Sequence, residues 1–168
     1  MRGQRGLVLL ISLTLVLLLG LLGLSSAGSA LQQQRMARNL RTSLQVFDQA
    51  HQLLQYAESR VQAQAWPPCA FCLPPPEAGD VTHGGVYAGP GESSGLDWQA
   101  GAGGFYLVQS LGASTQARHM PRGLEVSLYR VTAVRREGMA RSVLESVIAQ
   151  PVDPTLSPAQ RILWRQIH

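Results

Sequence analysis

The chain has 168 residues and a mass of 18.2 kDa, which allows one compact domain with an appendage but not two independent cores. Only 14% of the residues are charged and 45% are hydrophobic, against roughly 25% charged in an ordinary soluble domain. The net charge of +4 comes from arginines dispersed along the chain, without the aromatic platform that a nucleic-acid interface would need. We therefore expect no nucleic-acid partner and an unusually apolar segment.

That segment begins at Leu7, and residues 7–24 carry no charge and only two polar side chains, Ser12 and Thr14. A run of this length predicts a membrane-spanning helix over about residues 7–27, in contact with membrane lipid. Arg2 and Arg5 precede it, and short basic flanks stay in the cytoplasm. The sequence thus predicts a single-pass protein of the bacterial inner membrane, with its C-terminal part in the periplasm.

No proline occurs between Leu7 and Trp66, so nothing forces the helix to stop after it leaves the membrane. We expect one long helix over 7–64. Its outer half is amphipathic, with apolar residues on one stripe and small residues beside it that would let a sheet approach: Leu40, Leu44, Phe47, Leu54 and Val61, widened by Val46, Ala50, Leu53 and Ala57.

Prolines between Trp66 and Pro76 end the helix, and residues 65–168 should form a periplasmic loop and β-sheet domain. Residues 77–104 are rich in Gly and Ser and predict mainly loop, with a short strand near Val86. Strands are expected over 105–111, 124–134 and 142–149, the last two as a hairpin, with Glu145 pointing away from the face of Leu144. The tail fits either a helix from Ser157 or a strand over 162–167, and we expect the strand.

The predicted fold class is therefore α+β: a long N-terminal helix, half in the membrane and half amphipathic, packed on a small antiparallel sheet.

Cys69 and Cys72 form a C-x-x-C motif. It could be a redox pair, half of a zinc site or a small structural disulfide. A redox motif should open a helix after a strand and a zinc site needs two further ligands, whereas this motif sits among prolines. We favour the disulfide.

Catalytic and metal-binding patterns are weak. The segment Gly91–Gly95 matches G-x-S-x-G, but a nucleophile elbow needs a strand before it and a helix after it, and glycines surround this one. The four histidines, His51, His83, His119 and His168, lack a ligand spacing. We expect no enzyme activity, no metal and no cofactor.

The N-terminus resembles the type III leader of prepilins, because Gly3-Gln4-Arg5-Gly6 directly precedes the apolar run. The resemblance implies a leader over 1–6, cleavage by prepilin peptidase between Gly6 and Leu7, and N-methylation of Leu7. Further segments are similar to the PilX-type minor pilins of the type IV pilus: residues 34–41 with Phe47, Gln49 and Ala50, the hairpin segments 128–133 and 142–146, and residues 163–166.

This resemblance implies a role in type IV pilus assembly, with other minor pilins and pilus assembly proteins as partners. One residue departs from the major-pilin pattern: Ile11 stands where polymerising subunits carry glutamate, which suggests a place in a tip or priming complex, since an unpaired carboxylate in the membrane is costly. Contacts through Ile11, Leu40, Leu44 and Phe47 would drive assembly. The alternatives are a minor pseudopilin of type II secretion, a membrane-anchored periplasmic binding protein, and a secreted protein whose signal is cleaved near Gly28.

Overall fold

The computed structural model describes residues 3–167, and the side chains of residues 7–23 and 28–167. One helix, α1, runs from Gly3 to Ala63, as the lack of prolines predicted. The chain divides between Arg41 and Thr42 into two compact units. The first is the N-terminal part of α1, and the second, here called the sheet domain, contains the remainder of α1 and every described strand.

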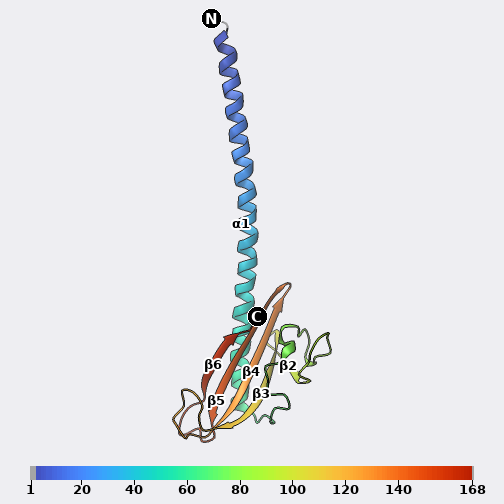
Figure 1. Cartoon of the computed structure of the whole chain (residues 1–168), viewed down its shortest axis with the longest axis vertical. Coiled ribbons are helices and arrows are strands. Elements are labelled where there is room, and N and C mark those ends of the chain that lie inside the picture. Colours follow the sequence, from blue (N-terminus) through green and yellow to red (C-terminus); the bar gives the residue numbers. More distant parts are fainter. Residues whose placement is uncertain (1–2, 168) are drawn as a thin grey trace. The chain divides into compact units, whose positions relative to one another are not determined.

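The sheet domain is built on a six-stranded antiparallel sheet with the strand order β1-β2-β3-β4-β5-β6, so that each strand pairs with its neighbours in the chain (Figure 1). This meander confirms the predicted α+β class. The elements after the helix are η1 (Pro76–Gly79), β1 (Gly85–Val86), β2 (Asp97–Gly101), β3 (Gly104–Ser114), β4 (Val126–Glu137), β5 (Ala140–Pro151) and β6 (Gln160–Gln166).

The end of α1 packs on one face of this sheet and forms the main core. The C-terminal part of the predicted helix stripe is buried here. It contacts side chains from one face of the three central strands, because successive side chains of a strand point to opposite faces. Complete burial of an aliphatic side chain such as Leu53 contributes about 1.5–3 kcal/mol. The buried residues are Ala50, Leu53, Leu54, Ala57 and Val61 from the helix and Tyr106, Val108, Val131, Ala133, Leu144 and Ile148 from the strands.

Gly104, at the start of β3, shows how closely helix and sheet approach. A Cβ atom at this position would lie 2.4 Å from the carbonyl oxygen of Val134 and 2.7 Å from the Cδ2 of Leu53. Neither distance is tolerable, and the first involves backbone, so residue 104 has to be glycine for β3 to pair with β4 beneath the helix.

The other face of the sheet is covered by the segment between the helix and β3, which the sequence predicted as mainly loop. That prediction was wrong in part, because η1 and β2 form there in addition to the short β1. Their apolar side chains make a second core, and tertiary contacts rather than a local apolar pattern stabilise these elements. This core contains Ala78, Val81, Tyr87, Trp98, Leu107, Val134 and Val143.

The C-terminal hairpin and the final strand are confirmed. β4 and β5 pair in register from Val126 with Pro151 to Glu137 with Ala140, and the turn is tighter than expected because the strands extend to Glu137 and Ala140. Gly138 in the turn has a φ of 57°, a left-handed conformation that favours glycine. The tail forms β6, which pairs with β5 and leaves its other side as an edge of the sheet.

Candidate assembly surface

The N-terminal part of α1 exposes an almost unbroken apolar surface. Leu7 and Ile11 are both exposed, and the two hydroxyls of the run donate hydrogen bonds within the helix, Ser12 to the carbonyl of Leu9 and Thr14 to that of Ile11. In the described part of the chain α1 meets the length and hydropathy criteria for crossing a membrane. Gly6, the residue before the predicted cleavage point, lies outside the residues whose side chains are described.

The apolar stripe of α1 is buried only in its C-terminal part. Leu54 and Val61 are fully enclosed in the core, whereas Leu44 is 60% exposed in the sheet domain and Leu40 is 61% exposed in the first unit. Phe47 is half-buried between these regions. The sheet therefore covers the stripe from Phe47 onward, and it leaves Leu44 without a covering strand.

Trp164 on β6 enlarges the exposed apolar area next to Phe47. The two rings meet edge to face with centroids 6.3 Å apart, and the ring of His51 lies 6.4 Å from the same indole. Trp164 remains 41% exposed. The pairing of β6 with β5 brings this tryptophan to the helix, and sequence inspection missed it as a surface residue because β6 is more than 100 positions away.

Glu58 links α1 to the last two strands by polar contacts. Its carboxylate accepts hydrogen bonds from Ser146 on β5 at 2.6 Å and from Arg161 on β6, whose Nε and Nη2 lie 2.8 and 2.5 Å from the two carboxylate oxygens. The side chain of Glu58 is only 15% exposed. A paired arrangement of this kind fixes the edge strand to the helix, and so fixes the position of Trp164.

The C-x-x-C segment lies against the sheet face opposite the helix. Cys69 and Cys72 form a disulfide with Cα atoms 5.4 Å apart. The side-chain amide of Gln109 donates hydrogen bonds to the carbonyls of Phe71 and Leu73, at 2.6 and 2.9 Å, and the Cys69 amide donates to Ser110 at 3.1 Å. The segment is thus anchored as a structural cover, without the strand and helix of a redox motif.

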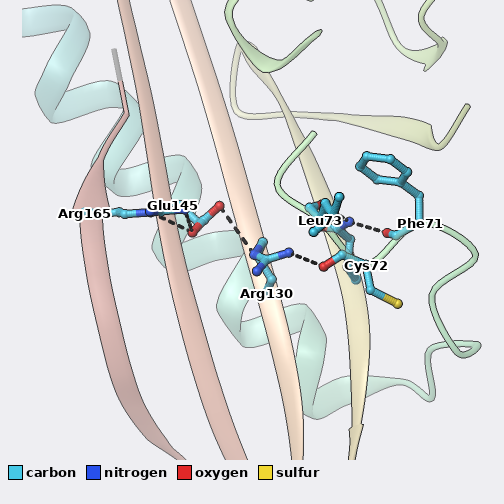
Figure 2. A network of polar contacts seen from close by, with 7 residues as sticks. Phe71, Cys72, Leu73, Arg130, Glu145 and Arg165 are labelled. Atoms are coloured by element: carbon cyan, nitrogen blue, oxygen red, sulfur yellow. Dashed lines mark hydrogen bonds and ion pairs between the residues drawn. The ribbon is translucent and has the colours of Figure 1, made fainter. Parts of the chain in front are cut away.

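On the same face of the sheet, Arg130 separates this segment from a carboxylate that two arginines share (Figure 2). Glu145 is completely buried and points away from the helix, as predicted, between Arg130 on β4 at 3.4 Å and Arg165 on β6 at 2.8 Å. Arg130 also donates to the carbonyl of Cys72 at 2.7 Å. Burial and the charge of Arg165 lower the pKa of Arg130, against the opposing effect of Glu145.

The segment Gly91–Gly95 surrounds a second buried carboxylate, that of Glu77. The Ser94 amide donates to it at 3.0 Å and the Trp98 indole at 3.2 Å, and the Ser94 hydroxyl also donates. Burial raises the pKa of Glu77, but these hydrogen bonds outweigh it and leave the pKa below its ordinary value. Ser94 therefore helps to hold a structural glutamate, while Ser93, at the serine position of the motif, donates to the Tyr87 carbonyl at 3.2 Å. Within residues 3–167 no three metal-binding side chains gather.

One comparison with known families matches the helix α1, including its apolar N-terminal part and its amphipathic outer half. Residues 5–62 match the family model described as PilX N-terminal. This segment is similar to the PilX N-terminal family. No curated protein and no solved structure matches the chain.

The matched segment coincides with α1, whereas the strands and the loops between them lie outside it. The match supports a PilX-type minor pilin related to the type IV pilus, in which an apolar N-terminal helix is compatible with a single-pass membrane anchor. It says nothing about the cleavage site, the disulfide or the hairpin.

Proposed function

We propose that this chain is a minor pilin that takes part in type IV pilus assembly within a tip or priming complex, and that it performs no catalysis. The observation that carries the proposal is the PilX N-terminal match over α1. The subunit would be held in the inner membrane with its sheet domain in the periplasm, after prepilin peptidase has cleaved between Gly6 and Leu7.

Ile11 supports a place at the start of the filament. Its side chain is apolar and exposed on α1, so it offers no carboxylate to the terminal amine of a preceding subunit. An apolar helix can still associate laterally with other helices, and Gly20 and Gly23, where an added Cβ would meet nothing within 4 Å, permit close approach. A subunit at the tip has no preceding neighbour to capture.

The sheet domain supports contact with a neighbouring pilin. Leu44, Phe47 and Trp164 form an exposed or half-exposed apolar area beside the edge strand β6. Exposed apolar residues that are gathered in one area indicate a contact with another protein. We assign this area to the helix of an adjacent minor pilin.

The test is to delete the gene, count surface pili, and complement with variants. Leu44→Glu should leave the protein at normal abundance but fail to restore piliation, because the charge would be buried in the contact with the neighbour. Gln45→Glu is the matched control: it places the same side chain one position along, at another exposed site, and should restore pili fully.

Two results would refute the proposal. Unchanged pili after deletion would exclude an assembly role, and sheared filaments containing this chain in amounts comparable to the major subunit would exclude a tip or priming role. A loss of protein secretion with normal pili would instead indicate a type II secretion pseudopilin.

A further inference from the structure

The loop between β3 and β4 surrounds a hollow of about 630 Å³, within the usual range of small-molecule sites. A backbone hydrogen bond from the Gly123 amide to the Thr115 carbonyl at 3.2 Å closes the loop, and two local turns lie in it, with Met120 donating to Ala117 at 3.3 Å and Leu124 to Pro121 at 3.2 Å. The lining residues are Thr115, Gln116, Ala117, Met120, Arg122 and Gly123.

The lining combines three kinds of group. Among the described residues that line the hollow, Arg122 alone is charged, and its guanidinium is the side chain best suited to hold a carboxylate through two parallel hydrogen bonds. Thr115 and Gln116 offer a hydroxyl and an amide, and the half-buried Met120 offers an apolar surface. A ligand that matches all three has an anionic group, hydroxyls and an apolar ring face.

A second hollow of about 320 Å³ adjoins the first, since Thr115 and Gln116 line both. It adds Ser114 and the carboxylate of Glu125. A carboxylate here would repel a compact phosphate but accepts hydrogen bonds from sugar hydroxyls. The pair of hollows therefore favours an extended ligand over a small anion.

The position of the β3–β4 loop in the sheet domain leaves it accessible to a ligand. Residues 61–65 at the end of α1 share a hollow with Tyr129 and Gln150, at the start of β4 and the end of β5, whereas Gln49 near the entry of α1 accepts a hydrogen bond from Arg135 at the other end of β4. The loop thus lies at the end of the sheet domain opposite the point where α1 enters it. A ligand can reach this end without crossing the helix.

We propose that the β3–β4 loop binds an acidic saccharide, with Arg122 on its carboxylate and Thr115, Gln116 and Glu125 on its hydroxyls. This site does not depend on the assembly role, because none of these residues belongs to the apolar area around Leu44.

The test measures binding of the full chain, purified in detergent, to an array of sialylated and galacturonate-containing oligosaccharides, with their uncharged counterparts and inorganic phosphate as competitors. Arg122→Gln should weaken binding by about tenfold or more, the value of one charge-assisted hydrogen bond. Arg118→Gln is the matched control, because it removes the same charge from the same loop at a residue that does not line the hollow.

Binding to acidic glycans that falls only in Arg122→Gln supports the site. Equal losses in the two variants would show non-specific attraction to a basic loop and overturn the proposal. Equal competition by uncharged glycans or by phosphate would also overturn the proposal. The proposal would likewise fail if no acidic glycan bound the wild-type chain better than it bound Arg122→Gln. Pilus counts in the Arg122→Gln strain should stay normal, so failure here is distinguishable from failure of the assembly proposal.

Discussion

Arg130 and Glu145 face each other across β4 and β5, with Nε and Oε2 3.4 Å apart and the glutamate entirely buried. Thr132, two residues along from Arg130, is the direct register partner of Glu145, so the arginine reaches the carboxylate diagonally. Arg165, which is the register partner of Glu145 on β6, completes the arrangement. One carboxylate thus holds two cations from the strands on either side of β5.

We predict that Glu145→Gln lowers the free energy of unfolding by about 3 kcal/mol, because removing one partner leaves the buried Arg130 uncompensated. The measurement is urea unfolding of the full chain in detergent, followed by tryptophan fluorescence. Glu137→Gln, an exposed carboxylate at the end of β4, should change the free energy by less than about 0.5 kcal/mol. Equal stabilities of the two variants would contradict the role given to Glu145.

Glu77 should make the stability of the sheet domain depend on pH. Its pKa in the folded state lies below the ordinary value of 4.5, so the ionised form stabilises the fold above that value, and this contribution is lost as pH falls through the folded pKa. Between about pH 5 and pH 3 the wild-type chain should lose more stability than Glu77→Gln. Unfolding free energies across this range test the prediction, with Glu92→Gln, an exposed carboxylate in the same segment, expected to behave as wild type.

Cys69 and Cys72 should be joined in the full chain extracted from membranes without reductant, and should resist alkylation until a reductant is added. Because the loop they close is very short, Cys69→Ser with Cys72→Ser should cost only about 2 kcal/mol in global stability. Hydrogen exchange should instead accelerate locally, at the amides of residues 69–73. Rapid alkylation without reductant would contradict this prediction.

The mature chain should begin at Leu7 and carry an N-methyl group, which the intact mass of the purified protein would show. Gly6→Glu should leave the longer precursor, since the prepilin resemblance places a glycine before the cut. Gly3→Glu, earlier in the same leader, should still be processed. A mature start near Gly28 would replace the prepilin interpretation with that of a cleaved secretory signal.

Much of this fold follows from local patterns. The uncharged run from Leu7 and the absence of proline before Pro67 determine a single long helix, because backbone hydrogen bonds in a helix are local and need no distant partner. β-Branched and aromatic residues likewise predicted β4 and β5, and alternation of apolar residues predicted β6. The PilX resemblance rested on α1, on the hairpin segments and on residues 163–166, and the family comparison matches the part of it that lies in α1.

Other features of the fold were decided only by the tertiary structure, because they depend on contacts between residues far apart in the chain. β2 has no apolar pattern of its own and forms because Trp98 is buried against η1 and donates to Glu77. Trp164 reaches Phe47 only through the pairing of β6 with β5. Glu145 was predicted to point away from the helix, but its burial required a second cover on the opposite face of the sheet. A single sequence shows which face a side chain takes, but not what lies over that face, because the covering segment is chosen by long-range packing.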